Sequence, residues 1–144
     1  MNQTYNLDRF ISAQETIYAS ALNELRNGKK QTHWMWFIFP QLKGLGFSTT
    51  AKFYGINDLT EVLAYLQHPV LRERLEECIQ AVINSKAKNP IAIFGHPDHL
   101  KFHSSLTLFY LAEPENKLFK EALEKYYQGI TDFETENIIS KQKR

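Results

Sequence analysis

One stretch of the sequence, Phe94–Phe109, holds side chains that could carry out acid–base or nucleophilic chemistry. If a helix begins at Asp98, then Asp98, Lys101 and Ser105 recur at spacings of three and four residues and share one of its faces. A desolvated lysine has a lowered pKa and can activate a nearby serine, here Ser104 or Ser105. The residue types therefore make Asp98, Lys101, Ser104 and Ser105 candidate catalytic residues.

The same spacing is also typical of an ordinary helix that faces solvent. In that interpretation Asp98 caps the helix, Lys101 pairs with it, and the two serines pack against a neighbouring element. Spacing alone favours this structural interpretation, so the catalytic one is kept as a hypothesis. The histidines of the stretch have neither a His-Glu-x-x-His pattern nor paired cysteines beside them, and we predict no metal site.

A second stretch, THWMWFIFPQLKGLG at residues 32–46, holds both tryptophans of the chain. As a strand it would place Trp34, Trp36 and Ile38 on one face and apolar residues on the other. As a short helix capped by Thr32 it would point apolar side chains in all directions. Either way the run must be covered on both sides, so we expect it in the core, with Trp34 and Trp36 also forming the wall of a ligand pocket.

The residues after Pro40 could bind the ligand. Glycines two positions apart let the backbone approach another group closely or adopt a positive φ. A glycine turn that leads into a helix near Ser48 can receive an anion through free backbone N–H groups, although GLGFST is not a complete P-loop. A tight turn with Ser48 as an ordinary N-cap is the alternative. The predicted ligand-binding residues are Trp34, Trp36, Gln41, Lys43, Gly44, Gly46 and Ser48.

Length and composition narrow the class of protein. A chain of 144 residues suits one globular domain, spanning residues 1–144. With 17 basic and 16 acidic residues it lacks the basic excess of a general nucleic-acid binder, so no nucleic-acid partner is expected. The single Cys78 and the lack of an export signal favour a cytoplasmic location. The apolar run Trp34–Phe39 is far shorter than the roughly 20 residues that span a bilayer, so no membrane partner is expected.

Apolar residues recur at helical spacing along most of the chain, and capping and stop signals divide them into elements. We expect helices between Asn6 and Gly28, after Asp58, from Pro69 to Ile83, from Asp98 to Glu113, across Leu118–Tyr126, and in a last segment opened by Thr131–Glu134. The piece IAIFGHPD, residues 91–98, is expected to be a strand or an irregular segment. The predicted fold class is mainly α, a compact domain of about six to seven helices with a buried aromatic segment.

Three segments, THWMWFIFPQLKGLGFSTTAKFYGI, AYLQHPVLRERLEEC and IFGHPDHLKFHSSLTLF, resemble a bacterial family known as domain of unknown function 1810. The resemblance covers nearly the whole chain and implies a single, mainly helical domain. Some family members carry the label calpastatin, but this sequence has no feature of a disordered protease inhibitor. His99 and His103 depart from the family pattern. More distantly, AYLQHPVLRERLEE is similar to part of a family of small α-helical proteins linked to NAD and ADP-ribose metabolism.

Together these features predict an intracellular protein that binds, or hydrolyses, a small ligand of nucleotide or ADP-ribose type. No cofactor is predicted. The alternative is a non-enzymatic domain that docks another protein through the aromatic run Trp34–Phe39. Neither the reaction nor the oligomeric state follows from the sequence.

Overall fold

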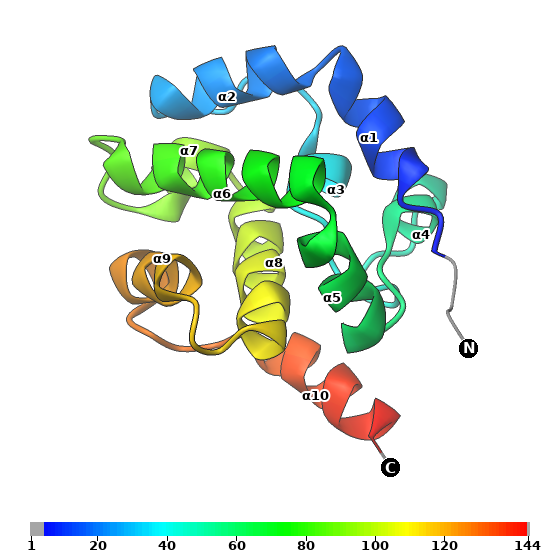
Figure 1. Cartoon of the computed structure of the whole chain (residues 1–144). Coiled ribbons are helices and arrows are strands. Elements are labelled where there is room, and N and C mark those ends of the chain that lie inside the picture. The colour runs from blue at the N-terminus through cyan, green and yellow to red at the C-terminus, as the bar shows by residue number, and fades with distance from the viewer. Residues whose placement is uncertain (1–4, 144) are drawn as a thin grey trace.

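Helices account for nearly all the regular structure in residues 5–143, which are the residues described in a computed structural model of the chain (Figure 1). Ten helices are present in this part: α1 (Asp8–Glu15), α2 (Tyr18–Arg26), α3 (Met35–Ile38), α4 (Thr49–Tyr54), α5 (Leu59–Gln67), α6 (Pro69–Asn84), α7 (Pro90–Phe94), α8 (Asp98–Ala112), α9 (Lys117–Tyr127) and α10 (Phe133–Gln142). The mainly α fold class is confirmed, but the predicted six to seven helices are too few.

The N-terminal helix predicted between Asn6 and Gly28 is in fact two helices, α1 and α2. The chain turns between them at Thr16 and Ile17, where the N–H of Ile17 bonds to the carbonyl of Gln14 at 3.1 Å instead of continuing the α pattern. Two adjacent β-branched side chains favour a break at this point. The turn lets α2 lie along α6 while α1 reaches α3 (Figure 1).

The short helices also differ from the predictions. The aromatic run forms α3, which is neither a strand nor a helix capped by Thr32, because Trp34 is its N-cap residue. The segment expected as strand or irregular structure begins with α7, where the Asn89 side chain accepts a hydrogen bond from the N–H of Ala92 at 2.8 Å. The last helix is capped by Asp132 rather than Thr131.

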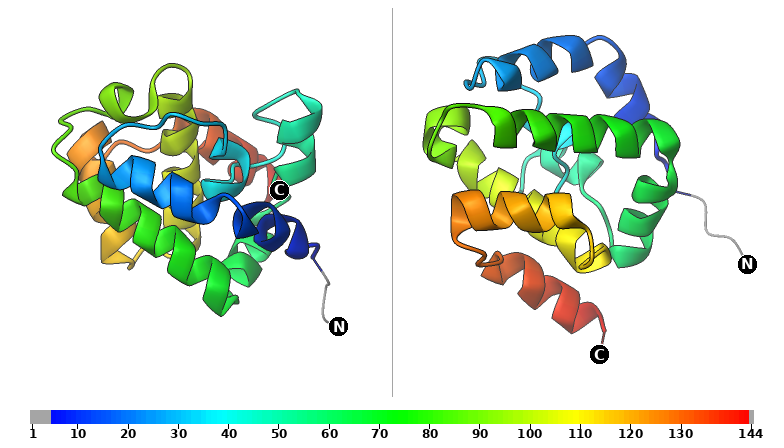
Figure 2. Two further views of the ribbon diagram at one scale, coloured as in Figure 1. Left: turned by 90° about the horizontal axis from the view of Figure 1, so that it is seen from above. Right: turned by 60° about the vertical axis from the view of Figure 1, so that its left-hand side comes forward.

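The long helix α8 lies at the centre of the molecule. It contacts α3, α5, α7, α9 and α10, and the views in Figures 1 and 2 show helices on several sides of it. A helix surrounded in this way needs apolar residues around most of its circumference. In α8, Phe102, Leu106, Leu108 and Phe109 are all buried. Helix α8 therefore provides a fixed support for side chains that reach the surface at its N-terminal end.

A close crossing of two backbone segments fixes the connection between α3 and α4. Leu42 and Ile56 form an isolated parallel bridge, and the N–H of Lys43 bonds to the carbonyl of Ile56 at 2.8 Å. Gly55 is needed there, since a Cβ atom on it would lie 2.8 Å from the Cα of Lys43. Among the described helices, none has the length and apolar character required to cross a membrane.

Candidate functional site

An open pocket of about 500 Å³ lies where the α3–α4 connection meets the N-terminal half of α8 and the start of α10. Its lining includes six of the residues selected from the sequence: Trp36, Gln41, Gly46, Ser48, Lys101 and Ser104. The two polar stretches of the sequence therefore meet in space at one pocket, which we call the α8 pocket. This convergence makes it the candidate functional site.

Trp36 and Lys101 form one wall of the α8 pocket. Both side chains are half-buried, and the Lys101 ammonium lies 5.3 Å from the centre of the Trp36 ring, within the range of a cation–π contact. Lys101 Nζ is also 3.5 Å from Asp98 Oδ1. The other oxygen of Asp98 pairs at 2.9 Å with Lys30, whose side chain is almost fully buried. Asp98 thus anchors the start of α8 from behind the wall and does not line the pocket.

Ser104 and Asp132 join α8 to the start of α10. The Ser104 hydroxyl donates to the Leu100 carbonyl at 3.1 Å, and it lies 3.2 Å from Asp132 Oδ2. The same oxygen accepts hydrogen bonds from the N–H and the hydroxyl of Thr135, at 3.0 and 2.6 Å. The N–H of Asp132 donates to Thr107 at 2.8 Å. This network holds a carboxylate and a hydroxyl at fixed positions beside the pocket.

The glycine turn supplies the opposite rim. Ser48 is an N-cap of α4, because its hydroxyl accepts from the N–H of Ala51 at 3.0 Å, which is the ordinary role considered from the sequence. Gly46 permits close packing, since a Cβ there would meet the Cβ of Ala51 at 2.7 Å. Phe47 lies between them and is strongly exposed. This rim is therefore a tight, pocket-lining turn.

Five other predicted residues lie outside the α8 pocket. Trp34 is fully buried in the core, Ser105 is buried with no partner for its hydroxyl among residues 5–143, and Asp98 lies behind Lys101. Lys43 lines a different pocket, on the other side of α4. Gly44 turns the chain with a φ of 106° next to Ile138. These five residues were predicted as part of the site because each is close in sequence to a residue that lines the α8 pocket.

Trp34 is held in the core by Glu24. Its indole N–H donates to Glu24 Oε1 at 2.9 Å, and the same carboxylate accepts from the N–H of Gln31 and from both the N–H and the hydroxyl of Thr32. Burial acts to raise the pKa of this carboxyl, but the hydrogen bonds from Thr32, Gln31 and Trp34 outweigh it and lower the pKa to about 2. Trp34 therefore has a structural role that orients α3, and Trp36 alone of the two tryptophans reaches the pocket.

Several lining residues of the α8 pocket were not selected from the sequence, among them the carboxylates Asp132 and Glu134 and the apolar Phe47 and Leu100. The segment TDFE was recognised as the start of a helix. No local signal places the start of α10 beside α8, because the contact between these two helices depends on the direction in which α9 leads the chain. Among the described residues there is no cluster of three or more His, Cys, Asp or Glu side chains that could hold a metal ion.

The fold and the pocket define a helical protein with one central helix and an open, mixed polar and aromatic site. The chain belongs to the family described as "Protein of unknown function (DUF1810)", whose model matches residues 4–139. It is similar to the conserved hypothetical protein Rv1873 from Mycobacterium tuberculosis, whose crystal structure was determined at 1.38 Å. The two chains share 47% identity and a TM-score of 0.92, over 94% of this chain and 97% of that one. The resemblance seen in the sequence is thus confirmed.

The comparison with curated proteins finds no match to this chain. The weaker similarity of residues 64–77 to proteins of NAD and ADP-ribose metabolism receives no support from the family match or from the solved structure.

Proposed function

We propose that the α8 pocket binds a small polar metabolite that carries a flat unsaturated ring, as nucleosides and their derivatives do. The observation that carries this proposal is the meeting of a half-buried indole, Trp36, with the hydroxyl of Ser104 and the carboxylate of Asp132 around one pocket. An aromatic wall can stack on a ring, and fixed polar groups can orient the rest of a ligand. A volume of about 500 Å³ suits a molecule of this size.

The charges of the α8 pocket favour the ring and sugar part of such a ligand over a phosphate. Lys101 is the one cation among the described lining residues, and it shares the Asp98 carboxylate with Lys30. Asp132 and Glu134 add negative charge at the α10 side. Carboxylates accept hydrogen bonds from sugar hydroxyls and repel phosphates. Among the ligands considered from the sequence, the nucleoside portion of a nucleotide or of ADP-ribose fits this lining.

The same geometry favours binding over hydrolysis. Asp132 Oδ2 already accepts two hydrogen bonds from Thr135, and the Ser104 hydroxyl lies 3.2 Å from it, which suits a residue that positions other groups. Glu134 is exposed, and its carboxylate has no hydrogen bond or ion pair within residues 5–143, so it is the carboxylate left for proton transfer if the protein turns its ligand over. Product analysis of each ligand that binds would decide between the two activities.

Thermal melting with a metabolite panel tests the proposal. The panel contains adenosine, NAD, ADP-ribose, mononucleotides and sugar phosphates. A ligand at 100 times its Kd stabilises the folded state by about 2.7 kcal/mol, which raises the Tm of a domain of this size by several degrees. We expect a selective rise for compounds that contain a nucleoside.

Two variants and a matched control locate the binding. Trp36→Leu and Lys101→Ala should abolish the rise, while Lys120→Ala, which removes an exposed lysine on α9, should keep it. A panel without any selective rise would contradict the proposal. So would a rise that survives in both pocket variants.

A second candidate function is a protein-interaction domain. The sequence placed its docking surface on Trp34–Phe39, where Trp34, Met35, Ile38 and Phe39 are buried, so Trp36 and Phe37 are the part of that run that can reach a partner. Large apolar side chains instead lie exposed around the α8 pocket, where Phe47 is 83% and Leu100 50% exposed. Exposed apolar groups that lie close together mark interaction surfaces. This function predicts self-association that Phe47→Ser weakens, measured by analytical ultracentrifugation, and no response to the metabolite panel.

A further inference from the structure

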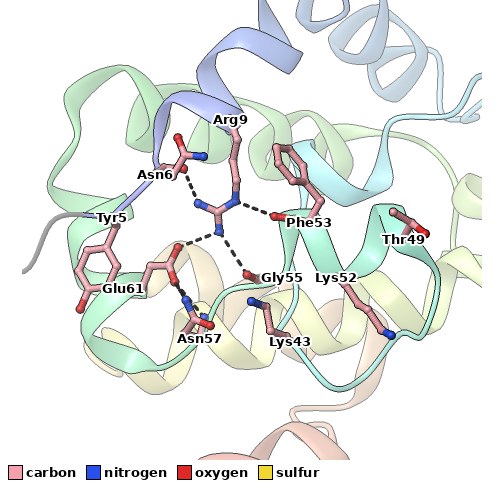
Figure 3. Close-up of a pocket in the computed structure, with 10 residues that line it drawn as sticks. All are labelled: Tyr5, Asn6, Arg9, Lys43, Thr49, Lys52, Phe53, Gly55, Asn57 and Glu61. Carbon is pink, nitrogen blue, oxygen red and sulfur yellow. Dashed lines mark hydrogen bonds and ion pairs between the residues drawn. The ribbon is translucent and has the colours of Figure 1, made fainter.

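A second pocket, of about 550 Å³, lies on the opposite side of α4 and shares no lining residue with the α8 pocket (Figure 3). It lies between α1, the α3–α4 connection and the start of α5, and we call it the α4 pocket. Among the described residues, its lining has three cationic side chains, Arg9, Lys43 and Lys52, and one carboxylate, Glu61. Of these four residues, only Lys43 is among the candidates selected from the sequence.

A buried ion pair forms part of the α4 pocket. Arg9 Nη2 lies 2.8 Å from Glu61 Oε2, and the two side chains are 7% and 1% exposed. Arg9 also donates to the carbonyls of Phe53, at 2.9 Å, and Gly55, at 3.2 Å. The remaining oxygen of Glu61 accepts from the backbone and the side-chain amide of Asn57, both at 2.9 Å. Each charge of the pair is thus matched within the protein, as burial requires.

The other two cations of the α4 pocket are not matched. Within residues 5–143, neither Lys43 nor Lys52 has an acidic group at ion-pair distance, and both side chains are exposed. Figure 3 shows the Lys43 ammonium beside Gly55, whereas the Lys52 side chain extends from α4 away from Lys43. Because Glu61 is used by Arg9, the free face of the pocket presents net positive charge.

The backbone holds Lys43 in place. Its N–H bonds to the carbonyl of Ile56, and Gly55 packs so closely against it that a side chain at that position would collide with the Lys43 Cα. Arg9 in turn binds the carbonyl of Gly55. One connected set of contacts therefore fixes the base of Lys43 relative to the buried pair, while the ammonium stays free to move to a ligand.

We propose that the α4 pocket binds the phosphate group of a small phosphorylated metabolite. Both lysines line this pocket and lack an acidic partner within residues 5–143, so their flexible side chains can supply charge-assisted hydrogen bonds to a doubly charged anion there. The pocket is much larger than a phosphate ion, so the organic part of the ligand lies against the exposed ring of Phe53, which also lines it. This site is independent of the nucleoside-type ligand proposed for the α8 pocket.

Titration of the ¹⁵N-labelled full chain with inorganic pyrophosphate, followed by NMR at constant ionic strength, tests the site. We expect saturable shifts of the backbone amides of Phe53, Gly55 and Asn57. In K43Q/K52Q the Kd should rise by about tenfold or more, because two charge-assisted contacts are lost. The control K86Q/K88Q removes two exposed lysines between α6 and α7 and should bind like the wild type.

Three results would overturn the proposal. The first is a set of shifts that grows linearly without saturation, and the second is saturable shifts that cluster around Lys101 instead of Gly55. The third is an equal loss of affinity in K43Q/K52Q and K86Q/K88Q, which would indicate a general effect of net charge. Because Lys43 and Lys52 are exposed, the spectra of the variants should match the wild-type spectrum away from the pocket. If the spectrum of K43Q/K52Q changes throughout, the same titration is carried out with K52Q alone.

Discussion

Glu24 illustrates how a single residue links α2 to the aromatic run. Its carboxylate accepts four hydrogen bonds, from the backbone and side-chain groups of Gln31, Thr32 and Trp34, and its pKa of about 2 lies below the ordinary value of 4.5. A carboxyl whose pKa is lower in the folded state stabilises the fold above the unfolded pKa. This stabilisation is lost as the pH falls from about 4.5 to about 2.

We therefore predict that Glu24→Gln lowers the free energy of unfolding by about 1–3 kcal/mol at pH 7. The difference from wild type should shrink as the pH falls from about 4.5 to about 2, because the wild-type carboxyl becomes protonated first in the unfolded state and then in the folded state. Urea unfolding at a series of pH values measures both effects. Glu121→Gln, at an exposed position on α9, is the matched control and should change little. A deficit in Glu24→Gln that stays constant down to pH 2 would contradict this account.

At the scale of elements, α4 differs from the other helices that line the two pockets. None of its six residues is buried, and in the left-hand view of Figure 2 it stands out from the body of the molecule. Gly46 precedes it and Gly55 follows it, and the α8 pocket and the α4 pocket lie on its two sides. An element with so little buried apolar surface opens locally at low cost in free energy.

We predict that the amides of residues 52–54 exchange with solvent through local opening, far faster than those of residues 104–109 in α8. Ser48→Ala removes the cap of α4 and should speed this exchange further while leaving the Tm almost unchanged. Asp58→Ala removes the corresponding cap of α5, whose Val62, Tyr65 and Leu66 are buried, and should lower the global stability by about 1 kcal/mol. Hydrogen exchange followed by NMR measures the rates, and equal protection of α4 and α8 would disprove the local opening.

At the scale of the whole molecule, the buried residues of the described chain form one continuous core around α8. Aromatic contacts extend through it, including Phe39 against Phe102 at 4.9 Å and Tyr65 against Phe109 at 5.3 Å between ring centres. These rings come from the aromatic run, α5 and α8. A core shared in this way couples the N-terminal and C-terminal halves of the chain.

We therefore predict one cooperative unfolding transition. Tryptophan fluorescence, which reports on α3, and far-UV circular dichroism, which reports on all helices, should give the same midpoint and slope in urea. A Trp36→Phe variant sharpens the test, because its remaining Trp34 is fully buried and should resist quenching by acrylamide until that transition. Two separated midpoints would show that the halves of the chain fold independently.

Several elements could be predicted from the sequence because their signals are local. The cap Asp58 and the prolines Pro69 and Pro97 mark the starts of α5, α6 and α8, and these signals depend only on neighbouring residues. Asp98 is the first residue of α8 and makes no side-chain cap hydrogen bond. The short helices α3 and α7 carry too few residues for a period to be measured, and their conformation depends on packing against α8. The family membership was also accessible, since it depends on residue identity along the chain.

The composition of each pocket was decided by the tertiary structure. Trp36 and Lys101 meet because α8 passes beside α3, and Asp132 joins them because α9 returns the chain to α8. Lys43 and Gly46 are near neighbours in sequence, yet they line pockets on opposite sides of α4. The chain turns between them at Gly44, with a φ of 106°, after the crossing at Leu42 and Ile56. The direction of a side chain follows the path of its backbone, and that path depends on contacts between residues distant in sequence. The sequence by itself therefore determined the helices and the types of residue available for binding, whereas the pairing of these residues into two separate pockets was decided by the fold.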